Sequence, residues 1–257
     1  MKQLSTLLLL SLLLLGTTTA HAEKITVAAA ADLKFAMDEI VVSFNKQHPR
    51  DQVEIIYGSS GKFFAQIQNN APYDLYFSAD ITYPRQLADK GFAASAVTSY
   101  AVGRIVLWSN SRDAAKMTLE NLTDPTIRKI AIANPRHAPY GKRAEEALRS
   151  LKLWDKVQHK LVFGENIAHT AQFVETGNAQ AGIVALALAL SPALAKQGSY
   201  YLIPAHLHQP LEQGYIITKR AADKPLAKLF SGYMTSKETR SIMTKYGFVL
   251  PGETVEK

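Results

Sequence analysis

The chain has 257 residues, a formal net charge of +7 at pH 7 and no cysteine, so disulfide bonds and thiolate chemistry are excluded. Its length is sufficient for one large or two medium domains with a packed core. The basic residues are scattered along the chain and do not cluster with aromatic residues, which argues against a nucleic-acid surface.

The first 22 residues have the pattern of a secretory signal peptide. Lys2 provides a short basic start, residues 7–15 are almost all leucine, and Ala20-His21-Ala22 has the small-x-small pattern of a cleavage site. The apolar run is shorter than the ~20 residues of a typical membrane span, and no cysteine follows it to carry a lipid anchor. We therefore expect residues 1–22 to be removed and a soluble, exported chain to begin at Glu23.

The next part of the chain alternates strands with helices. Apolar periodicity predicts strands over 24–30, 53–57 and 74–78, and helices over 33–44, 62–70 and 85–90. Such an alternation is typical of a mostly parallel sheet with helices on both faces.

The pattern changes after Gly91. Residues 100–108 form a long β-branched and aromatic run with no helix immediately before it, which we interpret as a strand that leaves a first lobe and enters a second. We predict further strands over 130–134, 162–163, 181–184 and 214–218, and helices over 139–151, 167–176, 185–196, 224–234 and 236–246. We expect the strand at 214–218 to pair with the 102–108 run. The resulting division places residues 23–101 and about 225–257 in lobe 1, and about 102–224 in lobe 2.

The turn Gly58-Ser59-Ser60-Gly61 lies where a strand changes into a helix. A helix N-terminus carries unpaired N–H donors and the positive end of the helix dipole, so it is suited to an anion. Alone, this turn favours an ordinary cap in which Ser59 or Ser60 closes the helix. However, similar loops at 31–32, 139–140 and 166–167 also follow strands, and ligands of open α/β sheets bind at such strand ends. This convergence favours an anion site between the lobes.

Four segments together resemble the periplasmic molybdate-binding proteins of ABC importers. They are residues 28–33, 58–61, 71–80 and 134–141, in the order and spacing of that family. The resemblance implies an α/β fold, the two-lobed type II periplasmic binding protein, in which each lobe is a mostly parallel sheet flanked by helices and two crossing strands join the lobes. It also implies a periplasmic monomer without enzyme activity or cofactor. Such a protein binds molybdate or tungstate and delivers it to a membrane permease with an ATPase.

The resemblance also implies which residues hold the oxyanion. The shell comprises Ala31, Asp32, Ser60, Tyr140 and Ile167, with Ser59, Asn166 and Ala185 in possible support and no direct metal-ion ligands. Ser60 would give its hydroxyl and its N–H, and Ile167 its N–H. Some relatives place a tyrosine at the position of Ala185, so we expect Tyr140 to supply the phenol from the other side.

Asp32 departs from the hydroxyl and amide groups that many relatives have at this position. A carboxylate would repel a dianion by about 4 kcal/mol per unit charge pair at ~4 Å and an effective dielectric constant of 20. We therefore expect Asp32 to present its backbone N–H, with its side chain turned back to cap its own helix. Lys62 and Arg136 are near the site in sequence, where they either steer the anion or remain solvated.

Two other functions stay open. A carrier of sulfate or another tetrahedral oxyanion would use the same kind of site, and cavity size would have to discriminate between the ions. A secreted phosphate-ester hydrolase would need a nucleophile with an adjacent base or a metal, and the sequence shows no motif for either. His206 and His208 could form a metal pair, but no further ligand type lies nearby, so we expect a surface loop there.

Overall fold

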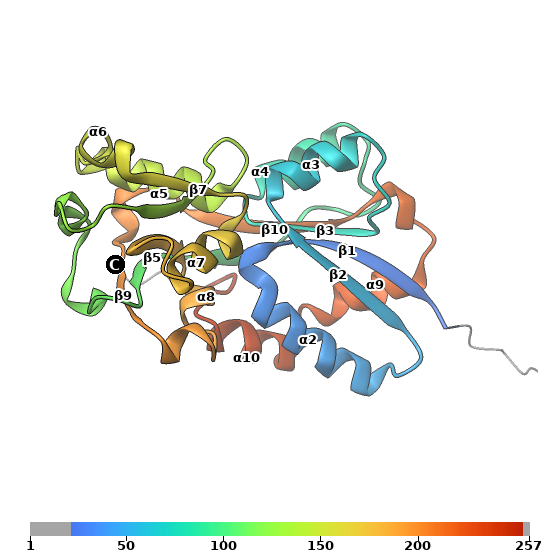
Figure 1. Cartoon of the computed structure of the whole chain (residues 1–257). Helices are drawn as coiled ribbons and strands as arrows, with labels where there is room; N and C mark the ends of the chain where they lie inside the picture. The colour runs from blue at the N-terminus through green and yellow to red at the C-terminus, as the bar shows by residue number, and fades with distance from the viewer. Residues whose placement is uncertain (1–21, 254–257) are drawn as a thin grey trace, which may run out of the picture.

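The computed structural model describes residues 22–253 and shows two α/β lobes side by side (Figure 1). The predicted signal peptide lies outside the described residues except for Ala22. Within the described part of the chain, no helix is long and apolar enough to cross a membrane.

The first lobe is built on a five-stranded sheet with the order β2-β1-β3-β10-β4. Its strands are β1 (Lys24–Ala30), β2 (Gln52–Gly58), β3 (Leu75–Ser78), β4 (Thr98–Gly103) and β10 (Leu211–Ile217). Strand β1 pairs in parallel with β2 and β3, whereas β10 runs antiparallel to β3 and β4. The predicted parallel arrangement is confirmed for the first three strands, and two antiparallel strands extend it.

Helices cover both faces of this sheet. One face carries α2 (Lys34–Gln47), α9 (Pro225–Tyr233) and α10 (Lys237–Lys245), and the other carries α3 (Ser60–Gln68) and α4 (Thr82–Asp89). Helix α2 has Met37, Ile40 and Phe44 on one stripe, and all three are fully buried. Phe44 meets Phe230 of α9 edge to face, with ring centroids 5.2 Å apart. Strand alternation thus supplies one apolar layer to each face.

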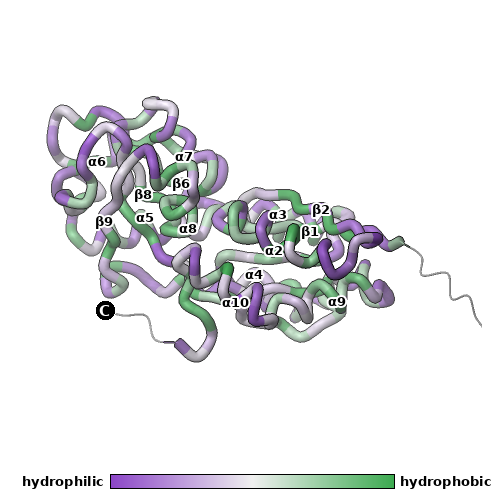
Figure 2. Tube along the Cα trace, turned by 90° about the horizontal axis from the view of Figure 1, so that it is seen from below, coloured by the Kyte–Doolittle hydropathy of each residue, from purple (hydrophilic) through white to green (hydrophobic). Residues whose placement is uncertain are grey.

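The second lobe repeats this architecture with the strand order β7-β6-β8-β5-β9. Its strands are β5 (Ile105–Ser109), β6 (Ile130–Ala133), β7 (Leu161–Gly164), β8 (Ala181–Ala185) and β9 (Ser199–Leu202). Its helices are α5 (Pro139–Ser150), α6 (Trp154–Val157), α7 (Ile167–Glu175) and α8 (Leu186–Ala189). Strand β6 is parallel to β7 and β8, and β5 is antiparallel to β8 and β9. Figure 2 shows apolar segments along the inner strands β1, β6 and β8.

The chain crosses between the lobes at Arg104. The single strand predicted over 100–108 is wrong, because β4 ends at Gly103 in the first sheet and β5 begins at Ile105 in the second. The Arg104 guanidinium donates to the carbonyl oxygen of Gly247 at 3.0 and 3.1 Å, which anchors the crossing point. The return crossing runs from β9 through residues 203–210 into β10.

The position of β10 bears on the division into lobes. Residues 102–224 are predicted for the second lobe, yet β10 pairs with β3 and β4 of the first sheet. We therefore propose that the lobe boundaries lie at Arg104 and within residues 203–210.

Two other local features differ from the sequence prediction. The helix predicted over 185–196 is interrupted and consists of α8 and a short 3-10 turn, Leu194–Lys196. Pro192 lies between them, and proline has no N–H for a helical hydrogen bond and disfavours helix at the preceding residue. Strand β9 follows where no strand is predicted, and it completes the second sheet beside β5.

The close approach of α5 to β6 generates a stability prediction. A Cβ at Gly141 would overlap the carbonyl oxygen of Ala133 at the end of β6. We predict that Gly141→Ala lowers the free energy of unfolding by about 1–3 kcal/mol, because the first turn of α5 must move away. The matched control is Gly232→Ala in α9, where a Cβ meets no atom within 4 Å. It should leave the stability unchanged or raise it by up to ~1 kcal/mol. Urea unfolding measures both variants, and equal effects would contradict the packing argument.

Candidate functional site

A small cavity lies between the lobes where the ends of several strands meet. The residues that line it come from the turns after β1, β2 and β3 and from the first turns of α5 and α7. They are Ala30, Ala31, Asp32, Gly58, Ser59, Ser60, Ala79, Ala138, Pro139, Tyr140 and Ile167. The cavity volume is only about 10 Å³, far below the ~300–1,000 Å³ of pockets that hold organic ligands. The site therefore suits a small, compact ligand such as a single ion.

Most of the residues predicted for the site line this cavity, and two do not. Those in the lining are Ala31, Asp32, Ser59, Ser60, Tyr140 and Ile167. Asn166 instead caps α7, because its Oδ1 accepts a hydrogen bond from the N–H of His169 at 2.9 Å. Ala185 is the fully buried last residue of β8.

Three helices from the two lobes begin at the cavity. Ser60 and Ile167 are the first residues of α3 and α7, and Tyr140 is the second residue of α5. The N–H groups of a first helical turn have no partner inside the helix, and the helix dipole adds positive potential there. In the described part of the chain, none of these three N–H groups donates to a backbone carbonyl outside its helix. The cavity is therefore surrounded by donors suited to an anion.

Ser60 adds a side-chain donor. Its hydroxyl oxygen accepts a hydrogen bond from the N–H of Ala79 at 3.0 Å, and its carbonyl oxygen accepts one from the Tyr76 hydroxyl at 2.8 Å. The residue is only 1% exposed. Because the hydroxyl donates to no acceptor among the residues the structure describes, its proton is available to a ligand in the cavity.

Ser59 and Gly61 hold the lobes together beside the cavity. The Ser59 hydroxyl donates to the carbonyl oxygen of His137 at 2.5 Å and lies 2.9 Å from Nδ1 of the same residue. The Gly61 N–H donates to the same carbonyl oxygen at 2.9 Å. A Cβ at Gly61 would come within 2.6 Å of that oxygen, so this approach requires glycine. Desolvation lowers the pKa of His137 below its usual value, which keeps the ring neutral near pH 7.

The basic residues near the site in sequence differ in their surroundings. Lys62 forms an ion pair with Glu165 of the second lobe, and both side chains are about half exposed. Such a pair contributes no more than ~1 kcal/mol and is screened by salt, so it adds little to closure. Arg136 is exposed and is not part of the cavity lining.

The Asp32 side chain does not cap its own helix, so this expectation was wrong. Its Oδ2 accepts hydrogen bonds from the Tyr140 hydroxyl at 2.9 Å and from the Gln213 amide at 2.8 Å. Gln213 Nε2 also lies 3.1 Å from the Tyr140 oxygen. The physical reason is burial, because a carboxyl with 1% exposure needs donors, and the second lobe and β10 supply them. The Tyr140 phenol, predicted to donate to the anion, donates to Asp32 instead.

Sequence reasoning missed Gln213. It is fully buried, and it lies at a bulge where the register of β10 against β4 shifts between Gln213 and Gly214. Bulges re-aim side chains beside functional sites. A Cβ at Gly103 on the facing strand would overlap the Tyr140 hydroxyl and approach Gln213 Nε2 to 2.6 Å. The sequence signal that could have identified Gln213 is a polar residue directly before a glycine, Gly214, in a largely apolar strand.

Burial controls the titration of this cluster. Desolvation raises the pKa of the Asp32 carboxyl from 3.8 to about 6, and the hydrogen bonds from Gln213 and Tyr140 partly oppose that shift. Burial and the neighbouring Asp32 charge together raise the pKa of Tyr140 well above its usual value. The carboxyl is therefore close to half-protonated at mildly acidic pH.

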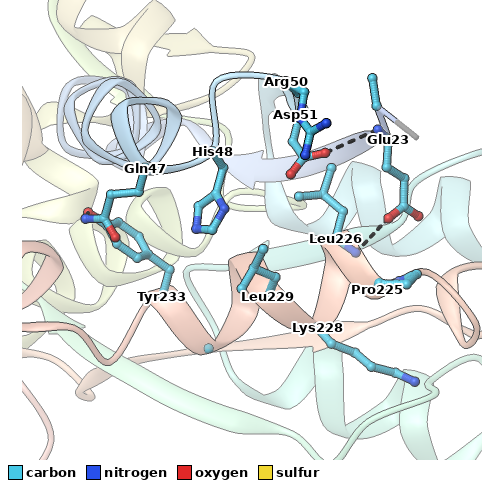
Figure 3. A pocket seen from close by; sticks show the side chains of 12 residues that line it. Glu23, Gln47, His48, Arg50, Asp51, Pro225, Leu226, Lys228, Leu229 and Tyr233 are labelled. Atoms are coloured by element: carbon cyan, nitrogen blue, oxygen red, sulfur yellow. Dashed lines mark hydrogen bonds between the residues drawn. The ribbon is translucent and has the colours of Figure 1, made fainter. Parts of the chain in front are cut away.

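A larger and more open groove lies at the far end of the first lobe, between the end of α2 and α9 (Figure 3). Two carboxylates face it. Asp51 accepts a hydrogen bond from the Glu23 N–H at 3.2 Å, and Glu23 accepts one from the Leu226 N–H at 2.8 Å. Arg50 and Lys228 line the groove as well, so its charges are mixed, and the groove does not lie between the lobes.

The fold and the cavity together define a class of protein. Two α/β lobes joined by crossing segments, with a small cavity of N–H and O–H donors between them, form a two-lobed solute-binding protein.

Comparison with known proteins identifies the family. Residues 25–249 match the bacterial extracellular solute-binding protein family, and the chain belongs to it. The molybdate-binding protein ModA of Azotobacter vinelandii is 34% identical over 232 residues, which cover 90% of this chain and 92% of that protein. ModA of Rhodobacter capsulatus is 33% identical over 233 residues, 90% of each chain. The solved structure of the Azotobacter vinelandii periplasmic molybdate-binding protein is 34% identical, has a TM-score of 0.83 and covers 88% of this chain and 99% of its own.

The raised pKa of Asp32 predicts how stability depends on pH. The folded protein holds the proton of the Asp32 carboxyl more tightly than the unfolded chain does. The resulting contribution to the free energy of unfolding is therefore complete below about pH 4 and is lost as the pH rises through about 6. Between pH 4 and 7, the free energy of unfolding of the ligand-free wild type should fall by up to about 3 kcal/mol relative to that of Asp32→Asn. Denaturant unfolding at several pH values measures this difference. The exposed Asp89→Asn serves as control and should follow the wild type. If the free energy of unfolding depended on pH in the same way for the wild type and Asp32→Asn, the raised pKa of Asp32 would be refuted.

Proposed function

We propose that this protein binds molybdate, and tungstate equally, in the cavity between its lobes and delivers the anion to a permease and ATPase of an ABC importer. The observation that carries the proposal is the convergence of three helix N-termini and the free Ser60 proton on one small cavity between the lobes. The two relatives above are named for molybdate binding, which supports this ligand. The periplasm is the proposed location.

The chemistry of the donors supports an oxyanion without a proton. Molybdate and tungstate carry no proton near neutral pH, so an enclosing shell of N–H and O–H groups can satisfy their oxygens. A protonated phosphate would need an acceptor as well, and a donor shell leaves its proton unpaired. We propose that Ser60 donates its hydroxyl and N–H groups, and that Ala31, Asp32, Tyr140 and Ile167 donate backbone N–H groups. In this proposal, no residue binds the metal atom directly.

Closure of the lobes would report the bound state to the importer. A ligand that contacts both lobes favours the closed arrangement over an open one, and the crossings at Arg104 and at 203–210 serve as the hinge. We propose that a monomer presents the surfaces of both lobes beside the cavity to the permease.

We further propose that the protein performs no catalysis. Ser60 is the hydroxyl at the anion site, and its oxygen contacts the Ala79 N–H rather than a general base. Ser59 also lines the cavity and its hydroxyl lies 2.9 Å from His137 Nδ1, but it donates to the His137 carbonyl oxygen at 2.5 Å. A hydrolase would need a base that accepts the proton of its nucleophile.

Calorimetric titration of the ligand-free mature protein tests the proposed ligand. We expect molybdate and tungstate each to bind tightly with one-to-one stoichiometry, and sulfate and phosphate to give no heat of binding. Sulfate is the informative competitor, because it has the same charge and no proton, so only cavity size can exclude it. Binding of sulfate as tightly as molybdate would reassign the protein as a general oxyanion carrier.

The role of Ser60 is tested by Ser60→Ala. Loss of a hydrogen bond to a charged ligand costs about 1.5–3 kcal/mol, so molybdate affinity should fall by roughly 10- to 100-fold. Ser150→Ala is the matched control, since Ser150 is exposed at the end of α5. Calorimetry on both variants gives the comparison. Wild-type affinity in Ser60→Ala would remove Ser60 from the site.

A further inference from the structure

The cavity contains a conflict of charge. Asp32 lines the proposed anion site, and its carboxyl is withdrawn from water with 1% exposure. A carboxylate and a dianion that share a site without water repel one another strongly, and the favourable outcome is neutralisation of one of them. Molybdate holds no proton near neutral pH, so the group that can be neutralised is Asp32.

The hydrogen bonds around Asp32 indicate which oxygen would carry the proton. Oδ2 accepts two hydrogen bonds, from Tyr140 and from Gln213, so a proton there would displace one of these donors. Oδ1 is buried and no donor of the described residues reaches it with hydrogen-bond geometry, although the backbone N–H groups of Asp32 and Leu33 lie close enough to the carboxyl to oppose the rise of its pKa. Tyr140 and Gln213 therefore act as positioning residues that leave Oδ1 as the site for the proton, where the carboxyl becomes a donor.

We propose that the oxyanion binds together with one proton from solvent, taken up by Asp32 Oδ1, so that Asp32 holds the anion as a neutral carboxylic acid. The inference rests on the proposed function, because it concerns the same ligand and the same cavity. The bond that forms is the O–H bond of the carboxyl, and solvent supplies the proton. The complex then carries one negative charge fewer than the dianion and an ionised Asp32 would carry together.

Among the residues that the structure describes, no cation forms an ion pair with Asp32, and the buried Arg143 of α5 pairs with Glu146 and Asp80 instead. Tyr140 of α5 and Tyr100 of β4 face Asp32, and both are neutral with pKa values raised well above the usual range. The remaining titratable groups on the elements packed against the turn at 31–33 are all at least partly exposed: Lys34, Asp38, Glu39 and Lys46 of α2, Glu54 and Tyr57 of β2, and His169 and Glu175 of α7. Burial already brings the pKa of Asp32 to about 6, and a dianion raises it further.

The protonation state of Asp32 would also determine which anion the cavity prefers. As an acid, Oδ1 donates and suits an oxyanion that has only acceptors. As a carboxylate, Oδ1 accepts and suits an anion that carries a proton, such as hydrogen phosphate. Molybdate affinity should therefore increase as the pH falls.

The test is calorimetry of molybdate binding to the wild-type protein at pH 7.5 in two buffers of different ionisation enthalpy. The buffer dependence should show uptake of close to one proton per molybdate, and the Kd should weaken by up to about tenfold per pH unit between pH 7 and 8.5. Asp32→Asn keeps the size of the side chain and has an amide N–H as donor. It should bind molybdate without proton uptake and with a Kd that does not change with pH. Asp89→Asn, exposed on α4, should behave as the wild type.

The outcomes separate this inference from the proposed function. Molybdate binding by the wild type with no proton uptake and no pH dependence would overturn the role of Asp32 and leave molybdate as the ligand. Unchanged proton uptake in Asp32→Asn would assign the proton to another group and would likewise overturn it. Absence of molybdate binding at every pH, or preference for hydrogen phosphate without proton uptake, would overturn both. The proton uptake and pH dependence of the wild-type protein test the proposal even if Asp32→Asn does not fold.

Discussion

The hydrogen bonds that converge on the Asp32 carboxyl are the constraint on which the closed structure depends. They join the turn after β1 in the first lobe, the first turn of α5 in the second lobe and the return strand β10. A buried carboxyl without donors would be costly, so the lobes have to meet at this point for Oδ2 of the carboxyl to gain its two donors. The same contact places the starts of α3, α5 and α7 around one cavity.

The donors of the cavity follow from the architecture of the two sheets. In each lobe, neighbouring parallel strands end at the same edge, and the helix after a strand begins there with unpaired N–H groups. Two such edges face each other across the cavity, which is why a site of backbone donors needs few polar side chains. Ser60 is the main addition, and its hydroxyl oxygen accepts from the Ala79 N–H while its proton remains available to a ligand.

Glycine at three positions allows this close assembly. Gly61 lies against the His137 carbonyl between the lobes, Gly103 leaves room for Tyr140 and Gln213, and Gly141 brings α5 against β6. Each is a place where a methyl group would meet backbone or a hydrogen-bonded side chain. The ion pair of Lys62 with Glu165 at the rim is half exposed and contributes far less. Shape and buried hydrogen bonds therefore dominate over surface charge in closing the lobes.

Sequence patterns alone predict the alternation of strands and helices in both lobes, the turn with Ser59 and Ser60 at the start of a helix, and the family to which the chain belongs. These features are local, because strand and helix periodicity and turn chemistry appear within a few residues. The tertiary fold is needed to see that Arg104 divides the crossing strand, that β10 joins the first sheet, and that Asp32 contacts Tyr140 and Gln213. Those partners are 108 and 181 residues from Asp32 in the chain. No local pattern encodes a contact that the folding of two lobes brings together.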